Sequence, residues 1–211
     1  MKTIIFANGE IETPQTLAAV LSGGGYLIAA DGGLRHLRTQ GLVPDLLIGD
    51  LDSVSKDDLE WIAKNCVEVR KFPVEKDQTD LELALLEAVE RGGDPIIVAG
   101  ALGGRIDQTL ANLYLLLMPE LQNSDVRLDD GREEVFIIQK SAEVFGKKGD
   151  IVSLLPLVTP AVGIKTKGLR FPLRNETLFP ERSRGISNEM TSQSAQITLK
   201  SGLLYCIHTR I

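Results

Sequence analysis

The chain has 211 residues, of which 43% are hydrophobic and 25% charged, and its formal net charge is −6. This is the composition of an ordinary globular protein, which excludes a disordered or fibrous chain, and no run of Lys or Arg is long enough to follow a phosphate backbone. We therefore expect no nucleic acid partner. No segment approaches the roughly 18 uninterrupted apolar residues of a membrane helix, and the N-terminus lacks the pattern of a signal peptide. We expect a cytoplasmic protein without a membrane partner.

The first part of the chain alternates short apolar runs with amphipathic stretches. The apolar runs predict strands, and the amphipathic stretches, each ended by a nearby Gly, Asn or Pro, predict helices. The expected strands are 3–7, 26–30, 46–48, 67–72 and 95–99, and the expected helices are 14–21, 34–40, 56–65, 81–90 and 108–118. This alternation predicts a mostly parallel, Rossmann-like α/β domain over residues 1–125, with ligands beyond the carboxyl ends of its strands.

The pattern changes after about residue 122. The segment QNSDVRLDDGREE reads as a polar connection, and the helical period then disappears. Short runs punctuated by Gly and Pro predict strands at 135–139, 142–145, 151–155, 161–165, 195–199 and 203–208, with LKSGLL as a hairpin turn. An antiparallel β-sandwich is expected over residues 126–211. Cys66 and Cys206 have neither metal nor disulfide spacing, so both are expected to be small core residues.

Two acids stand where the third expected strand stops, in PDLLIGDLDS. In an extended chain Asp50 and Asp52 would share one side, and two neighbouring carboxylates favour a bound cation. The alternative is that Asp50 ends a strand, while Asp52 and Ser53 form an Asx or capping turn in contact with solvent.

Further acids follow the neighbouring strands. Asp31 ends the second strand in AADGG, and KDQTDLELALLEAV follows the fourth. In that segment Thr79 and Glu82 fit a capping box, which would place Asp80 at the first helical position. Capping alone explains Asp80, but it does not explain why Asp77 and the other acids would converge on one edge of the sheet.

A glycine turn follows the fifth strand in GALGGRIDQT. Gly103 and Gly104 can let backbone N–H groups approach an anion at a helix N-terminus, and Arg105 adds a forked donor for phosphate oxygens. Such a sequence can also be only a turn, and it lacks the patterns of a P-loop or a dinucleotide fingerprint. Beside an acidic crevice, however, it favours a polyphosphate bound with Mg²⁺ and phosphoryl-type transfer.

The motifs ADGG, PDLLIGDLDS, KDQTD and GALGGRIDQTLANL, followed by GLRFPLRNETL and RGISNE, resemble the thiamine pyrophosphokinase (thiamine diphosphokinase) family along nearly the whole chain. The resemblance implies a homodimer with active sites between the α/β domain of one subunit and the sandwich of the other. The implied reaction converts ATP and thiamine to AMP and thiamine diphosphate.

The resemblance also assigns roles to individual residues. It implies that Mg²⁺ is held by Asp50, Asp52 and Asp80, with Asp31 and Asp77 nearby in the acidic crevice. The residues implied to bind the nucleotide phosphates or thiamine are Thr79, Gly103, Gly104, Arg105, Asp107, Gln108, Ser187 and Asn188. Arg105 would also neutralise charge during transfer, and Asp80 or Asp107 could accept the proton of the thiamine hydroxyl.

One position departs from the pattern of many bacterial members, which have His where this chain has Gln108. An amide can hydrogen-bond phosphate but cannot act as an acid or base. Three other functions stay open on the residues alone. They are a pyrophosphokinase for another heterocyclic alcohol such as a hydroxymethylpterin, a Mg²⁺-dependent phosphohydrolase, and a nucleotide-binding or thiamine-sensing module without turnover.

Overall fold

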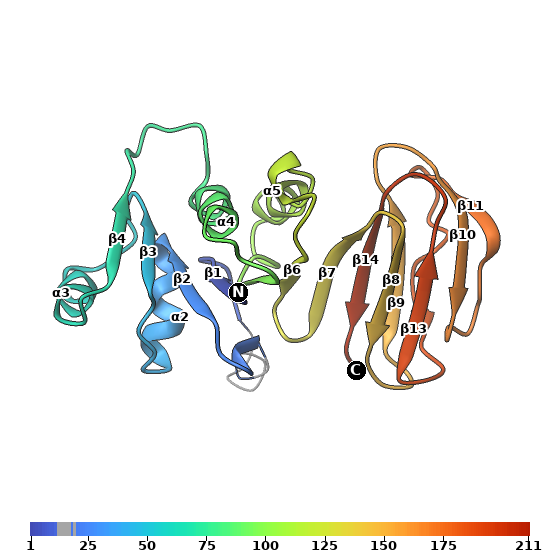
Figure 1. Cartoon of the computed structure of the whole chain (residues 1–211), viewed down its shortest axis with the longest axis horizontal. Coiled ribbons are helices and arrows are strands. Elements are labelled where there is room, and N and C mark those ends of the chain that lie inside the picture. Colours follow the sequence, from blue (N-terminus) through green and yellow to red (C-terminus); the bar gives the residue numbers. More distant parts are fainter. Residues whose placement is uncertain (12–17, 19) are drawn as a thin grey trace. The chain divides into compact units, whose positions relative to one another are not determined.

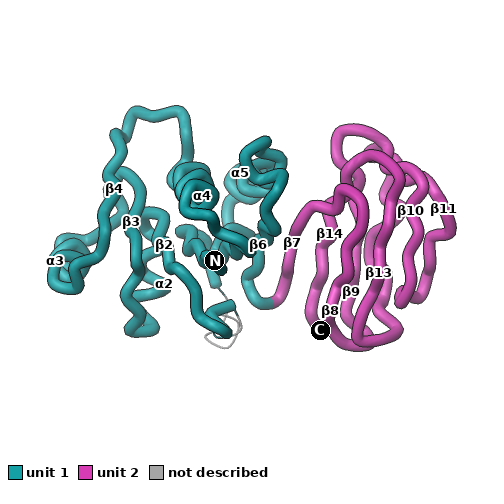
Figure 2. Tube along the Cα trace, in the orientation of Figure 1, with its two compact units in different colours: residues 1–131 teal, residues 132–211 magenta. Residues whose placement is uncertain are grey.

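The computed structural model describes residues 1–11, 18 and 20–211. The chain divides into two compact units, residues 1–131 and 132–211 (Figure 2). The helix expected at 14–21 lies largely outside the described residues. Within the described part of the chain, no helix has the length and apolar character needed to cross a membrane.

Unit 1 is built on six parallel strands in the order β6-β5-β1-β2-β3-β4 (Figure 1). Their bounds are β1 Thr3–Phe6, β2 Tyr26–Ala30, β3 Leu46–Gly49, β4 Glu68–Lys71, β5 Ile96–Ala99 and β6 Val126–Asp129. The central strands β1 and β3 are buried at every position, as expected of parallel strands covered on both faces. The sheet ends at β4, whose charged sequence EVRK suits an exposed edge.

Helices cover both faces of this sheet (Figure 1). They are α2 Leu34–Thr39, α3 Lys56–Lys64, α4 Asp80–Glu90 and α5 Ile106–Leu115, with short 3₁₀ turns η1 Asp31–Gly33 and η2 Pro119–Leu121. On one face, Leu34 and Leu37 of α2 and Ile62 of α3 pack in one core with alternate residues of β1, Ile4 and Phe6. Helix α4 packs against β1, β2 and β3 and contributes a separate buried row. This agrees with the predicted doubly covered sheet.

The strand order reverses at β1. From β1 the chain proceeds outward through β2, β3 and β4 on one side, and returns through β5 and β6 on the other. Loops at the carboxyl ends of β1 and β5 therefore lead away in opposite directions and leave a crevice between them.

Unit 2 is an antiparallel sandwich. One sheet has the order β12-β9-β14-β7 and the other β11-β10-β13-β8. The strands are β7 Glu133–Ile138, β8 Ser141–Phe145, β9 Ile151–Pro156, β10 Ala161–Lys167, β11 Arg174–Leu178, β12 Asn188–Glu189, β13 Ser194–Thr198 and β14 Leu204–Thr209. Inward residues of both sheets form one apolar core, with Phe136 and Leu204 from the first and Val144 and Ile197 from the second. The predicted fold class, an α/β unit followed by a β-sandwich, is confirmed.

The structure departs from the sequence predictions at several elements. The expected connection after residue 122 contains β6, which pairs in parallel with β5, so unit 1 extends to residue 131 rather than 125. Strands β11 and β12 lie in segments where none was predicted. LKSGLL is not a hairpin turn, because β13 pairs with β8 and β10 whereas β14 pairs with β7 and β9, so this turn links the two sheets. Cys66 is exposed rather than in the core.

Candidate active site

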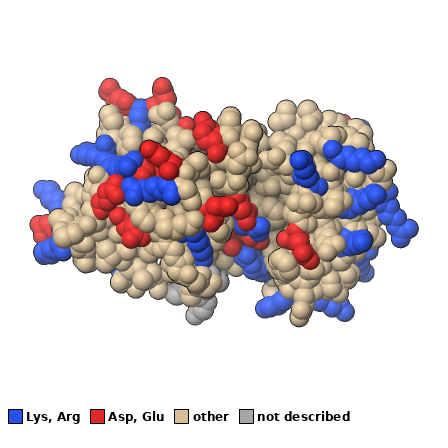
Figure 3. All heavy atoms as spheres, in the orientation of Figure 1, with Lys and Arg blue, Asp and Glu red and all other residues tan. Residues whose placement is uncertain are grey.

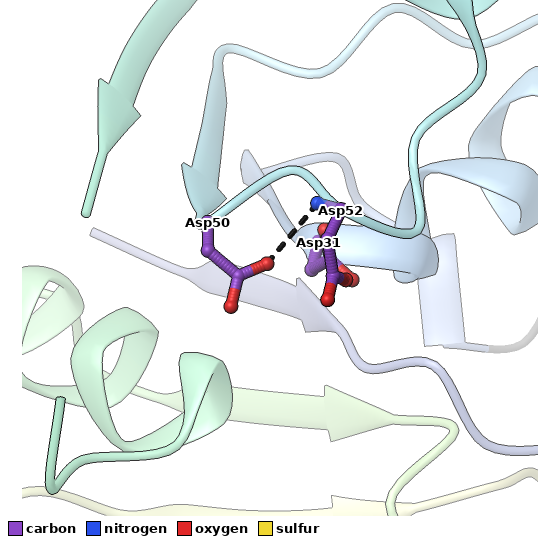
Figure 4. A group of neighbouring side chains, drawn as sticks. All are labelled: Asp31, Asp50 and Asp52. Atoms are coloured by element: carbon purple, nitrogen blue, oxygen red, sulfur yellow. Dashed lines mark hydrogen bonds between the residues drawn. The ribbon is translucent and has the colours of Figure 1, made fainter. Parts of the chain in front are cut away.

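Three aspartates meet at the carboxyl end of the sheet of unit 1. Asp31 follows β2, and Asp50 and Asp52 follow β3. Each offers a carboxylate oxygen within 4.8 Å of the others, as Figure 4 shows. Asp31 is only 6% exposed, and its Oδ1 has no hydrogen-bond partner among the described residues. A buried carboxylate oxygen left unpartnered beside two other acids is an arrangement that a cation would stabilise.

The chain brings Asp50 and Asp52 together by a tight turn. We expected an extended segment, but the strand ends at Gly49 and Leu51 has φ of 66°, in the left-handed region. The backbone N–H of Asp52 donates to Oδ1 of Asp50 at 3.1 Å, and this bond is the leading cause that lowers the pKa of Asp50. The helix that follows is capped by Ser55, which accepts from the N–H of Asp58. An Asx turn is thus present beside the acid cluster, but Asp50 forms it rather than Asp52 and Ser53, and the helix cap is Ser55.

Lys76 joins this cluster to Asp80. Its Nζ lies 3.1 Å from Oδ2 of Asp50 and 3.0 Å from Oδ1 of Asp80. Burial alone would lower the pKa of Lys76, but its contacts with Asp80 and Asp50 raise it, so the ammonium stays charged. Burial raises the pKa of Asp80 in spite of this partner.

Asp80 begins helix α4, as the capping box predicts. Thr79 is the N-cap, and its hydroxyl accepts from the N–H of Glu82 at 3.2 Å. Gly49 keeps the approach to this helix open, because a Cβ there would lie 3.1 Å from the carboxyl group of Asp80 and 3.0 Å from Cβ of Asp31. The acids after β2 and β3 and the start of α4 therefore share one edge.

The glycine turn after β5 forms the opposite wall. Gly100, Gly103 and Gly104 all have positive φ, near 70°. A Cβ on Gly100 would lie 2.7 Å from the carbonyl oxygen of Ala7, so the turn can approach β1 closely only with glycine there. The hydroxyl of Thr109 donates to the carbonyl of Gly103 at 2.9 Å and holds the turn on α5.

Arg105 stands at the N-cap position of α5 and is open to solvent. Its side chain does not cap the helix. In the first turn the N–H of Gln108 already donates to Oδ1 of Asp107 at 2.9 Å, so only the N–H groups before it are left for an anion. The guanidinium is 76% exposed and pairs with Asp107 at 2.6 Å. The hydrogen bond from Arg105 is the main cause that lowers the pKa of Asp107, which makes this carboxylate a weak base.

These walls enclose a crevice of about 520 Å³ at the point where the strand order reverses. It is lined by the predicted Asp31, Thr79, Asp80, Gly103, Gly104, Arg105 and Gln108. Asp50 and Asp52 do not line the crevice themselves but lie beside Asp31, which does. Asp77 and Asp107 are exposed and are not among the residues that line it.

Sequence reasoning missed several residues of this crevice, among them Asn8, Arg35 and Asn112. Arg35 donates to the carbonyl oxygens of Asn8 and Gly9 at 2.8 and 2.9 Å, and the amide of Asn112 donates to the carbonyl of Ala101. The signal for Asn8 was present, because Asn8-Gly9 directly follows the first strand, as the other site motifs follow theirs.

Unit 2 has a pocket of its own, of about 490 Å³. Its walls include Val152, Leu154, Leu169, Phe171 and Ile186, with Arg170, Arg174 and Arg184 at the same pocket. The amide of Asn188 is engaged on both sides by the backbone of Phe171, donating at 2.8 Å and accepting at 3.0 Å. Asn188 thereby fastens this loop to β12. Ser187 donates its backbone N–H to Oγ of Ser153 and does not line the pocket.

The two pockets differ in chemistry. The crevice of unit 1 combines carboxylates with backbone N–H groups and an arginine, which suits a metal-bound polyphosphate. The pocket of unit 2 is mainly apolar with a few polar groups, which suits a small heterocycle.

Both units match family models. Residues 17–128 match the model described as "Thiamin pyrophosphokinase, catalytic domain", and residues 135–204 match "Thiamin pyrophosphokinase, vitamin B1 binding domain". The thiamine pyrophosphokinase of Bacillus subtilis (strain 168) is 29% identical, over 99% of this chain and 99% of that protein. Thiamine pyrophosphokinase 1 of Oryza sativa subsp. japonica is 27% identical, over 79% of this chain and 67% of that protein.

Solved structures agree in fold over the full length. The crystal structure of thiamine pyrophosphokinase from Bacillus subtilis superposes with a TM-score of 0.89 at 27% identity. The match covers 100% of this chain and 99% of the Bacillus chain. That of a thiamin pyrophosphokinase family protein from Enterococcus faecalis has a TM-score of 0.84 at 27% identity, with 100% of both chains covered. The chain belongs to the thiamine pyrophosphokinase family.

Proposed function

We propose that the chain transfers the pyrophosphoryl group of ATP to the hydroxyl group of thiamine, giving thiamine diphosphate and AMP. The observation that carries the assignment is the crevice at the strand-order reversal, where three clustered aspartates face a glycine turn and the N-terminus of α5. Family membership supports thiamine as the acceptor.

Mg²⁺ fits the acidic end of this crevice. Its preferred ligands are one or two carboxylates together with phosphate oxygens and water. Asp50 and Asp52 are proposed as ligands, as the family resemblance implies, and the unpartnered Oδ1 of Asp31 makes this residue a further candidate. Asp80 is proposed to contact the metal as well, although Lys76 already holds one of its oxygens. When bound, Mg²⁺ would neutralise negative charge on the polyphosphate.

The nucleotide phosphates are proposed to bind the other wall. Gly103 and Gly104 expose backbone N–H groups, Arg105 supplies an exposed guanidinium, and Gln108 can donate its amide N–H to a phosphate oxygen. Arg105 would leave Asp107 for the phosphate, because both side chains are exposed and their pairing is weak in water.

Proton transfer from the thiamine hydroxyl is assigned to Asp80. Its raised pKa makes it a better proton acceptor than Asp107, whose pKa is lowered. The alkoxide oxygen would attack the β-phosphorus, and the bond from that phosphorus to the α-phosphate oxygen would break, so that AMP carries away the electron pair.

Thiamine is proposed to enter the pocket of unit 2, where Leu154, Phe171 and Ile186 provide apolar walls for its rings. Asn188 would act by holding Phe171 in place rather than by touching thiamine, because its amide is already bound on both sides. Ser187 is proposed to contact thiamine directly.

A homodimer is proposed as the working form. Support comes from α5, which has no buried residue and exposes Ile106, Leu110 and Tyr114 along one stripe. A helix with a continuous apolar face normally packs against a partner.

A cytoplasmic location also belongs to this proposal, in keeping with two cysteines that are both free thiols.

The assignment is tested by incubating the protein with ATP, Mg²⁺ and thiamine and following the products by ³¹P NMR and mass spectrometry. We expect AMP and thiamine diphosphate in equal amounts, and loss of both with Asp52→Ala but not with the exposed surface variant Glu60→Gln. Phosphate release without thiamine would identify a hydrolase, turnover only with another alcohol would identify a different acceptor, and binding without turnover would identify a sensor.

A further inference from the structure

Three arginines line the pocket of unit 2, although the ligand proposed for this pocket, thiamine, is itself a cation. Arg170, Arg174 and Arg184 all line it. Thiamine carries a positively charged thiazolium ring, and like charges near a pocket of low polarity oppose binding. The balance of charge around this pocket therefore determines which form of the vitamin it prefers.

Two of the arginines are neutralised by acids on neighbouring segments. Arg170 pairs with Glu189 at 3.0 Å, and Arg184 pairs with Oε2 of Glu176. The other oxygen of Glu176 accepts the backbone N–H of Arg174 at 3.3 Å. Glu176 is thus engaged through both oxygens, and it leaves the guanidinium of Arg174 without an ion pair among the described residues.

The surroundings of Arg174 add positive charge. Lys165 lies directly opposite Arg174 in the register of β10 and β11, and Lys165 likewise has no ion pair within the described part of the chain. Like charges facing each other across two strands destabilise a sheet unless an anion lies between them. Unit 2 as a whole has twelve Lys and Arg against seven Asp and Glu, and its face in Figure 3 carries mostly basic side chains.

We propose that Arg174 forms an anion subsite at the edge of this pocket and that the pocket binds phosphorylated thiamine more tightly than thiamine itself. The apolar walls hold the heterocycle, and the free guanidinium binds a terminal phosphate oxygen through a charge-assisted hydrogen bond. The product would then compete with thiamine for its own pocket. This inference rests on the proposed function, because it takes thiamine as the occupant.

The test is calorimetric titration of the full chain with thiamine and with thiamine diphosphate in the presence of EDTA. Chelation removes divalent cations, so a metal bridge to the aspartates of unit 1 cannot hold the diphosphate. We expect the wild type to bind thiamine diphosphate at least about tenfold more tightly than thiamine, as one charge-assisted hydrogen bond allows. Arg174→Gln should lower this ratio by about tenfold, and Arg174→Lys should restore part of it.

Lys167→Gln is the matched control, because Lys167 is an exposed cation of the same sheet that has no ion pair among the residues described and does not line the pocket. It should leave the ratio unchanged. Circular dichroism melting checks that each variant folds. The anion subsite is overturned if the ratio of the two affinities is the same in wild type and Arg174→Gln, or if it falls equally with Lys167→Gln. In either case, binding of thiamine itself would still support the proposed function. Failure of the wild type to bind either ligand overturns both.

Discussion

The structure places Asp31, rather than Asp80, in the group of three neighbouring carboxylates. The family resemblance implied Asp50, Asp52 and Asp80 as metal ligands, with Asp31 nearby. In the structure the oxygens that lie within 4.8 Å of one another belong to Asp31, Asp50 and Asp52, and Asp80 is linked to Asp50 through Lys76, which pairs with both. The difference arises because Asp31 turns into the cluster with φ of 45° directly after its strand, a conformation that strand periodicity does not predict.

The pKa shifts distinguish the two candidates for proton acceptor. Asp80→Asn should lower kcat by at least about 100-fold, the usual contribution of a general base, because the amide cannot accept the hydroxyl proton. Asp107→Asn should cost less than about tenfold, since the pKa of Asp107 is lowered by Arg105 and the side chain is exposed. Steady-state kinetics with saturating ATP and thiamine would measure both. A larger loss in Asp107→Asn than in Asp80→Asn would assign the base to Asp107.

Helix α4 joins the active site to the opposite end of the sheet. Its first residue, Asp80, lies in the crevice, and near its last turn Glu87 is buried, with 5% exposure. Glu87 accepts from Arg70 of β4 and from Arg91, which also stacks on the ring of Tyr26, 5.0 Å from its centroid. This network anchors the helix to the edge strand and so sets the position of its N-terminus.

Removing the charge of Glu87 should loosen this anchor. Glu87→Gln should lower the free energy of unfolding by roughly 1–3 kcal/mol, since two charge-assisted bonds are weakened in a largely buried place. Glu90→Gln is the matched control on the same helix, because Glu90 is 77% exposed and lies 4.0 Å from Arg70. Urea unfolding followed by circular dichroism gives both values, and equal losses would refute the role of burial.

The strands of the sandwich enclose a second buried charge cluster. His208 of β14 is fully buried, with Nε2 3.1 Å from Asp150 and Nδ1 3.6 Å from Glu134 of β7. Burial alone would lower the pKa of His208, but the two carboxylates raise it. Arg210, 3.7 Å from Glu134, opposes this effect without reversing it. The imidazolium is therefore the form that stabilises the sandwich.

The sign of the pH dependence follows from this shift. A raised pKa gives stability that is fully present below the unfolded value of about 6.5 and is lost as the pH rises through the folded value. We expect the free energy of unfolding of the wild type to fall from pH 6 upward, and His208→Gln to be less stable at pH 6 and to lack this fall. Thermal melts between pH 6 and 9 measure it, with His36→Gln as a control in unit 1. An unchanged slope in His208→Gln would contradict the assignment.

The whole chain is strongly asymmetric in charge. Unit 1 has 22 Asp and Glu against 11 Lys and Arg, whereas unit 2 has more basic than acidic residues. An excess of negative charge around the crevice favours Mg²⁺ and the thiazolium cation, and the basic sandwich favours anions. The opposite charges of the two units are in keeping with the proposed homodimer.

The proposed dimer is tested through the stripe on α5. Ile106, Leu110 and Tyr114 are 77%, 48% and 60% exposed and recur every fourth residue. Leu110→Glu should convert a species of twice the chain mass of 23.0 kDa into one of 23.0 kDa, because a buried charge opposes association. Light scattering after size exclusion measures this mass, and Lys64→Glu on α3 is a control for added charge. A wild type of 23.0 kDa would refute the homodimer, and a dimeric Leu110→Glu would place its interface elsewhere.

Sequence alone was sufficient for the fold class, the alternation of strands and helices in unit 1 and several residues of the crevice, among them Asp31, Asp80 and Arg105. Each of these depends on patterns that are local in the chain: alternation of apolar runs with helical periods, polar residues directly after strands, and a cap such as Thr79 before α4. The family motifs could be read for the same reason, since each occupies one strand end and its loop.

Only the tertiary structure decided which strands pair and which charges meet. Strand β6 is too polar to be recognised until its pairing with β5 is known, and β13 and β14 look like a hairpin until each is assigned to its own sheet. The approach of Asp31 to Asp50 and Asp52 likewise joins segments that are separate in the chain. So do the ion pairs of Arg170 and Arg184, beside which Arg174 has none among the described residues. Such contacts depend on packing and burial, which a linear pattern does not encode.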